Sequence, residues 1–210
     1  MSAEKPRERP ILFNDQMVRA ILEGRKTATR RIAKPVKHPD LGNIYAPGAL
    51  VLEREPQHVI DRACPYGQPG DRLWVREAWQ GPLISDEEQA ANQSWWKDMT
   101  KFQNPGHCAY RASGDDNEYV DPDGYFHCKW KPSIHMPRWA SRILLEITAV
   151  RVERLHDLSD PGALAEGVSH SEMHSGDSLV DVFARLWKSI GGDWDANPWV
   201  WVVEFKRVTP

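Results

Sequence analysis

The sequence has few cysteines, no long apolar run and no internal repeat. Its 210 residues include three cysteines, Cys64, Cys108 and Cys128, and this odd number is more typical of reduced thiols than of a disulfide framework. No apolar stretch approaches the roughly 20 residues that a membrane-spanning helix needs. The first ten residues, MSAEKPRERP, lack the apolar segment of a secretory signal. We therefore expect a cytoplasmic protein with no membrane partner.

A broad excess of positive charge is also missing. Lysine and arginine number 27 against 30 aspartates and glutamates, which gives a formal net charge of -3. A protein that coats long nucleic acid needs a wide basic surface, so we do not expect DNA as a partner. A small ligand or a local contact with RNA is compatible with this charge. Ten tryptophans are present; most should fill the core, and others could stack on a nucleobase.

Several motifs for catalysis and cofactor binding are absent. The sequence has no G-x-S-x-G, no G-x-x-x-x-G-K-[ST] and no G-x-G-x-x-G, so a serine hydrolase elbow and the common nucleotide sites have no support. Possible metal ligands occur in two His-Cys pairs, His107-Cys108 and His127-Cys128, and in HSEMH at 170–174. Adjacent residues of a strand point to opposite faces, and no C-x2-C pair is present. We therefore expect no metal site and no cofactor.

The hydrophobic pattern predicts many strands and few helices. Asn14 can cap a helix that ends at Gly24, and Ser159 can cap a short helix that ends at Gly167. Apolar spacing predicts a third helix at 178–190. We expect strands at 10–13, 49–55, 73–76, 142–155 and 198–208, and a hairpin between 107–112 and 125–133. This pattern predicts an α+β fold in one domain, a small and mostly antiparallel barrel with helical additions.

The segment GRKTATRR, at 24–31, places cationic side chains around two threonines. If burial and neighbouring arginines lowered the pKa of Lys26, its neutral amine could take the proton of the Thr29 hydroxyl and make it a nucleophile. A structural explanation is simpler, because cations after a helix stabilise the negative end of its dipole. Spacing alone favours the structural explanation.

Four segments, taken in order, resemble the ASCH domain family: GRKTATRR, GDRLWVRE, LEITAVRVERL and LSDPGALAEGV. The longer blocks CPYGQPGDRLWVREAW, KWKPSIHMPRWASRI and NPWVWVVEFKRV resemble its bacteriophage and prophage members and extend the resemblance over nearly the whole chain. The family has a barrel related to the PUA fold. The resemblance therefore implies a single PUA-like domain over 1–210, with additions at about 34–70, 80–137 and 168–195.

The resemblance also implies a chemistry. Small bacterial members of the family are amidohydrolases that remove the acyl group from N4-acetylcytidine. Their lysine, threonine and glutamate fall on Lys26, Thr29 and Glu166. Thr29 would attack the acyl carbonyl or orient a water, and Lys26 would accept the hydroxyl proton. Glu166 would set the charge of the lysine or activate the water.

Further residues are expected to bind the substrate. Arg31 and the backbone near Gly24 could hold the oxyanion or the carbonyl of the base. Trp79 or Trp139 could stack on the pyrimidine, and the segment PRWASR could bind ribose or phosphate, although packing of this loop explains its residues equally well. The full expected set is Gly24, Arg31, Glu77, Trp79, Arg138, Trp139, Ser141 and Arg142.

Three functions remain open on the sequence. We predict an amidohydrolase that deacylates N4-acylated cytidine or a related modified nucleoside. The alternative is an RNA-binding protein or ribonuclease that uses the same basic pocket, since other family members are associated with these activities. A virion or assembly protein that kept the barrel for protein contacts is the third.

Overall fold

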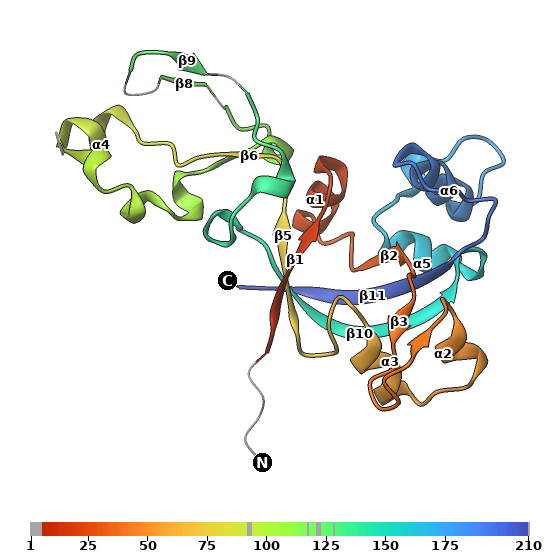
Figure 1. Ribbon diagram of the computed structural model, residues 1–210. Helices are drawn as coiled ribbons and strands as arrows, with labels where there is room; N and C mark the ends of the chain where they lie inside the picture. Colours follow the sequence, from red (N-terminus) through yellow and green to blue (C-terminus); the bar gives the residue numbers. More distant parts are fainter. Residues whose placement is uncertain (1–5, 92–93, 117, 121–122, 128, 210) are drawn as a thin grey trace. The chain divides into compact units, whose positions relative to one another are not determined.

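The computed structural model describes residues 6–91, 94–116, 118–120, 123–127 and 129–209 (Figure 1). The chain divides into two compact units. Unit 1 contains Met1–Arg9, Ala20–Leu73 and Leu145–Val208, and unit 2 contains Pro10–Arg19, Trp74–Leu144 and Thr209–Pro210. The expected additions at 34–70 and 168–195 lie in unit 1, and the addition at 80–137 lies in unit 2.

A five-stranded sheet contains the long strands. In spatial order they are β1 (Glu8–Leu12), β5 (Arg72–Arg76), β10 (Leu144–Arg154), β11 (Trp199–Val208) and β2 (Ala28–Ile32). Figure 1 shows the long ribbons of β10 and β11 side by side. β2 pairs antiparallel with β11, and Thr29 lies opposite Val203. The predictions of strands in β1, β5, β10 and β11 are confirmed.

The predicted barrel is wrong. Within the described residues, the strands form an open five-stranded sheet and three separate two-stranded sheets, with no closed barrel. A closed barrel needs enough long strands, tilted and staggered so that the last pairs with the first. Here the strands outside the main sheet are two residues long: β3 (Val36–Lys37), β4 (Ile44–Tyr45), β6 (Trp79–Gln80), β7 (Ala109–Tyr110), β8 (Tyr119–Val120) and β9 (Phe126–His127). The fold class is α+β, as predicted.

Two local predictions are also wrong. Residues 49–55, expected as a strand, begin with helix α2 (Ala49–Leu52), because Gly48 has a positive φ of 83° and its carbonyl accepts the N–H groups of Val51 and Leu52. Among the described residues of 107–112 and 125–133, the strands do not pair with each other as the expected hairpin requires. Instead β7 pairs with β6, and β9 pairs with the nearer β8.

The three predicted helices are confirmed. α1 (Asp15–Leu22) starts after Asn14, whose Oδ1 accepts the N–H of Met17 at 2.9 Å, and it ends before Gly24, with φ 75°. α5 (Asp160–Ala165) is capped by Ser159 and followed by Gly167, with φ 95°. α6 (Leu179–Ser189) is capped by Ser178.

The structure contains further short helices. The sequence predicts one short helix within the polar segment 81–107, where α4 (Asp86–Ala91) lies, and it does not predict the others individually. Two of them, α3 (Gln57–Ala63) and α4, fall in the expected additions. Single turns of 3-10 helix occur at Trp95–Lys97, Thr100–Phe102, Pro105–His107, Arg111–Ser113, Ser133–His135, Arg138–Ala140, Leu155–Asp157 and His170–Glu172. Among the described helices, none is long and apolar enough to cross a membrane.

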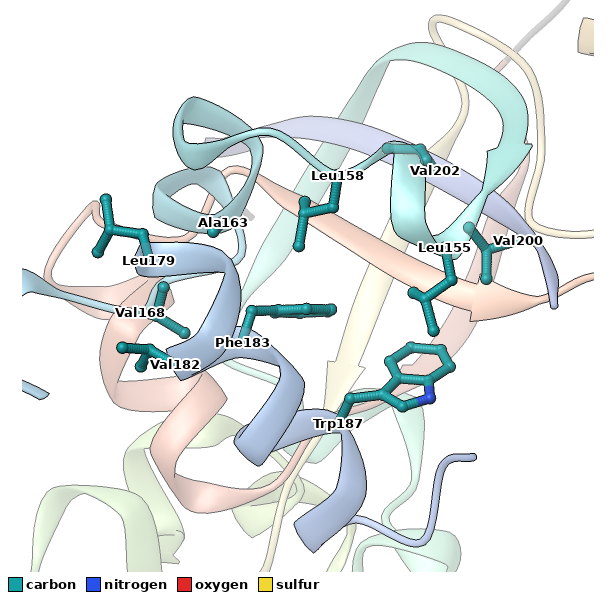
Figure 2. Close-up of a cluster of buried hydrophobic side chains, with 10 residues drawn as sticks. All are labelled: Leu155, Leu158, Ala163, Val168, Leu179, Val182, Phe183, Trp187, Val200 and Val202. Carbon is teal, nitrogen blue, oxygen red and sulfur yellow. The ribbon is translucent and has the colours of Figure 1, made fainter. Parts of the chain in front are cut away.

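The apolar face of α6 packs onto α5 and β11 in unit 1. Figure 2 shows Phe183 in the middle of this cluster and Trp187 below Leu155 and Val200. Ala163 of α5 belongs to the same cluster and is fully buried. The cluster consists of Leu155, Leu158, Ala163, Val168, Leu179, Val182, Phe183, Trp187, Val200 and Val202. This packing holds α5 in place, and Glu166 follows the C-terminal end of α5.

Candidate functional site

The turn after α1 brings the segment 24–31 back toward the end of α5. The N–H groups of Arg25 and Lys26 both donate to the carbonyl of Ala20, at 2.8 and 3.0 Å. Gly167 packs against this turn: a Cβ added there would lie 3.0 Å from the Cβ of Lys26 and 2.8 Å from that of Ala20. The close approach therefore requires glycine at 167 and brings the backbone of α5 against Lys26.

Lys26 and Glu166 form a buried ion pair. Lys26 Nζ lies 2.5 Å from Oε2 of Glu166 and also donates to the Glu166 carbonyl at 2.9 Å. The exposed fractions of the two side chains are 0% and 3%. Glu166 follows the last turn of α5, and its N–H donates to the carbonyls of Gly162 and Ala163. Lys26 thus also places a cation at the negative end of a helix, which is a structural role.

Arg30 joins this pair to a second carboxylate. Its Nη1 lies 3.3 Å from Oε1 of Glu166, and its Nε and Nη2 donate to Oε1 of Glu153 at 3.0 and 2.8 Å. Arg30 is also buried, at 4% exposure. Glu166 therefore binds one cation through each carboxylate oxygen. Glu153 binds a further cation, because its Oε2 accepts Nε of Arg151 at 2.8 Å, and Arg151 in turn pairs with Glu204. We call Lys26, Arg30, Glu153 and Glu166 the Lys26 cluster.

Thr29 and Arg31 follow one another at alternate positions of β2, so strand geometry turns them to the face opposite Ala28 and Arg30. Thr29 is 1% exposed. Within the part of the chain that the structure describes, its hydroxyl makes no hydrogen bond, to Lys26 or to another group. The structure thus places Lys26 in direct contact with Glu166. The Thr29 hydroxyl, three residues further along the chain, is not part of this contact.

Burial is the largest effect on the pKa values of Lys26 and Arg31. It lowers the pKa of Lys26, while the charge of Glu166 and its hydrogen bond raise that pKa, and Arg31 and Arg30 lower it further. The pKa of Arg31 is also lowered by burial, against the opposing effects of Tyr66 and Glu166. Arg25, by contrast, is at the surface, where it pairs with Glu23 at 2.6 Å.

The remaining expected substrate residues lie in unit 2, where Glu77 and Arg142 form a second ion pair. Nε and Nη2 of Arg142 donate to Oε1 and Oε2 of Glu77 at 2.9 and 2.8 Å, and its Nη1 donates to Ser113 at 2.7 Å. The guanidinium lies 3.9 Å from the centre of the Tyr110 ring. Glu77 is fully buried, and burial raises its pKa against the opposing effect of Arg142.

The two expected stacking residues contact each other in the same unit. The rings of Trp79 and Trp139 are 5.5 Å apart and nearly perpendicular, and Trp79 is 4% exposed. Ser141 donates its hydroxyl to the carbonyl of Val75 at 2.8 Å, which is a structural use of this side chain. Arg138 is exposed at the start of its 3-10 turn.

The described residues contain no group of three or more histidine, cysteine, aspartate or glutamate side chains that could hold a metal ion. Cys64 and Cys108 are free thiols. Cys128, from the second His-Cys pair, lies outside the described residues.

No family model and no curated protein matches the chain. It is similar to two solved structures. One, from Lactobacillus crispatus JV V101, is 16% identical over 92% of this chain and 72% of that chain, with a TM-score of 0.33. The other, a protein from Enterococcus faecalis V583 assigned to the DUF984 family, is 12% identical over 100% of this chain and 84% of that chain, with a TM-score of 0.37.

The Lactobacillus structure is an ASCH domain. It belongs to the family whose motifs this sequence resembles. At these identities and TM-scores, however, the function has to be inferred from the residues of this chain.

Sequence reasoning missed two members of the buried cluster. The sequence indicates Arg30 only as one of the neighbouring arginines that would lower the pKa of Lys26, and it does not indicate Glu153. Arg30 lies between Thr29 and Arg31 in β2, and Glu153 lies between Val152 and Arg154 in β10. Because each has a polar or charged neighbour, the local sequence gives no signal that either side chain is buried and paired.

Proposed function

We propose that the protein hydrolyses the amide bond of N4-acylated cytidine or of a related modified nucleoside. The observation that carries the proposal is the buried pair of Lys26 and Glu166, with Nζ and Oε2 2.5 Å apart, next to a strand that holds the buried Thr29. These residue types occupy the positions that the resemblance to ASCH amidohydrolases assigns to catalysis.

Each residue has a role in this reaction. Neutral Lys26 takes the proton of the nucleophile and passes it to the leaving nitrogen as the C–N bond breaks. If the nucleophile is a water that Thr29 orients, this step releases the carboxylic acid and the free base directly. If it is the Thr29 hydroxyl, an acyl ester of Thr29 forms, and a water activated by Lys26 then hydrolyses that ester to release the acid and restore the hydroxyl. Burial, which lowers the pKa of Lys26, favours the neutral amine. The direct hydrogen bond between Lys26 and Glu166 supports a role for Glu166 in setting the charge of the lysine. Arg31 stabilises the oxyanion.

The charges of the cluster favour a neutral substrate over an RNA backbone. Lys26 and Arg30 are buried and already bound to Glu166 and Glu153. Binding of a phosphate chain depends on cations that are available to replace its counterions. The amide of an acylated base needs no such surface, so this site fits the amidohydrolase better than the alternative of an RNA-binding protein or ribonuclease.

Hydrolysis of N4-acetylcytidine tests the proposal, since acetyl is a small acyl group suited to a buried site. We expect wild-type turnover, and a loss of roughly 10²-fold to 10⁴-fold in kcat for Lys26→Ala, Thr29→Val and Glu166→Ala, the range of general acid and base catalysis. Thr29→Ser should retain activity because it keeps the hydroxyl. Thr27→Val and Lys34→Ala, at exposed positions, are the matched controls and should retain full activity.

Folding of each variant is checked by circular dichroism and urea denaturation. Removing one partner of a buried ion pair destabilises a protein by about 3–5 kcal/mol, so Lys26→Ala alone would be ambiguous. The comparison of Thr29→Val with Thr29→Ser avoids this problem, because neither substitution breaks the pair. No turnover by folded wild-type protein with several acyl groups, or full activity of Thr29→Val, would contradict the proposal.

A further inference from the structure

Unit 1 contains a pocket whose lining residues are distinct from those of the Lys26 site. It has a volume of about 470 Å³, within the roughly 300–1,000 Å³ of small-molecule sites, and three arginines, Arg7, Arg9 and Arg62, line it. Arg7 immediately precedes β1, Arg9 lies at the start of β1, and Arg62 comes from the last turn of α3. Arginines from two separate segments therefore converge on one hollow, which we call the arginine pocket.

Two carboxylates, Asp61 and Asp71, line the same pocket, but both are engaged by the protein. Asp71 is 7% exposed, and its two oxygens accept the backbone N–H groups of Arg7 at 2.9 Å and Gln68 at 3.2 Å. Asp61 accepts the amide of Gln57 at 2.7 Å. These bonds hold the loop and the helix that shape the pocket. A third carboxylate, Asp40, pairs with Arg62, so the positive charge that Arg62 offers to a ligand depends on displacing Asp40.

Two of the arginines, Arg9 and Arg62, can offer N–H donors to a ligand. Arg9 donates Nη1 to the carbonyl of Pro65 at 2.6 Å, which fixes the side chain while four further N–H groups remain in its fork. Arg62 pairs with Asp40 at 2.7 Å, with exposed fractions of 47% and 46%. A surface pair of this kind contributes little, so an anionic ligand can replace Asp40. Burial raises the pKa of the Cys64 thiol to about 11, so this lining residue adds no negative charge.

We propose that the arginine pocket binds the phosphate group of a nucleotide-sized ligand. Planar guanidinium groups recognise phosphate through paired N–H donors, and the volume admits a nucleoside attached to that phosphate. The site does not depend on the proposed amide hydrolysis, because none of its lining residues belongs to the Lys26 cluster.

Isothermal titration with inorganic phosphate, cytidine 5′-monophosphate and cytidine tests this proposal on the full chain. We expect both phosphate-bearing probes to bind and cytidine not to bind at this site. Tighter binding of the nucleotide than of phosphate identifies a nucleotide site, whereas equal binding identifies a site for the phosphate alone. In either case Arg9→Gln and Arg62→Gln should each weaken binding at least tenfold.

Arg207→Gln, which removes an exposed arginine of β11, is the matched control and should leave binding unchanged. Thr29→Val should also bind normally, so failure of the proposed hydrolysis and failure of this site can be told apart. The proposal is overturned if phosphate and nucleotide do not bind, or if Arg9→Gln and Arg62→Gln bind them as the wild type does. Equal binding of cytidine and its monophosphate would overturn it as well.

Discussion

Arg30 is the residue whose position most constrains the proposed chemistry. It contacts Glu166, the partner of Lys26, and its charge is one of the effects that lower the pKa of Lys26. Removing that charge in Arg30→Gln should therefore raise the pKa of Lys26. Since the neutral amine is the active base, the ascending limb of kcat/KM against pH should move to higher pH. At neutral pH we expect a loss of activity on the order of 10²-fold, the effect of a misplaced catalytic group.

Two further variants separate charge from position. Arg30→Lys keeps the positive charge but loses the three N–H contacts that hold Glu153 and Glu166, so it should reduce kcat while leaving the ascending limb in place. Arg25→Gln removes an exposed cation of the same segment and should change neither kcat nor the position of the ascending limb. If the limb of Arg30→Gln coincides with that of the wild type, Arg30 does not act on Lys26 through its charge.

Only some of the site residues can be predicted from a sequence pattern. The motif of eight residues at 24–31 indicates Lys26 and Thr29. Glu166 lies 140 positions from Lys26, so only the resemblance to a family indicates it. The link through Arg30 to Glu153 depends on the register of β2 and β10 within the sheet. Local spacing carries no information on such register, so this contact could not be predicted.

The element that holds Glu166 in place is α6, through its packing on α5. Phe183 is 3% exposed at the centre of the cluster in Figure 2. Phe183→Ala should reduce the free energy of unfolding by about 3–5 kcal/mol, the cost of lost burial and of the cavity that remains. Urea denaturation measures this directly.

The control for this prediction lies on the same stretch of chain. Ile190, just after α6, is 45% exposed, and Ile190→Ala should change stability by less than about 0.5 kcal/mol. Equal effects of the two substitutions would contradict the assignment of Phe183 to the core.

Predictions of elements succeeded where a helix or strand carries its own signals. α1, α5 and α6 each have a capping side chain at the start, and β10 and β11 are long and apolar. They failed at 49–55, where four apolar residues do not distinguish a strand from the single helical turn that follows Gly48. They failed again for β7 and β9, because strand partners far apart in sequence are set by the fold and not by the segments themselves.

At the scale of the whole molecule, the α+β class was predictable and the closed barrel was not. Alternation indicates the strands β1, β5, β10 and β11, but closure depends on pairing between the first and last strands, which no local pattern records. The barrel was expected because the sequence resembles ASCH domains. The described strands instead form an open sheet, β1-β5-β10-β11-β2.

The charge of the whole molecule separates a nucleoside from an RNA substrate. The chain has a net charge of -3, and Lys26 and Arg30 are buried and bound to carboxylates. We therefore expect kcat/KM for free N4-acetylcytidine to change less than about twofold between 50 and 200 mM salt, because no counterions are released when a neutral ligand binds. Steady-state assays at several salt concentrations measure this slope.

The same assay with N4-acetylcytidine inside a short RNA gives the contrast. An RNA held through 6–10 phosphates would lose roughly 10³-fold to 10⁵-fold in affinity over that range of salt. A steep slope, together with a higher kcat/KM than for the nucleoside, would show that RNA is the substrate and would contradict our expectation. A shallow slope of about -1 that disappears in Arg62→Gln would instead assign one phosphate contact to the arginine pocket, because a single neutralised phosphate changes the salt dependence by that amount.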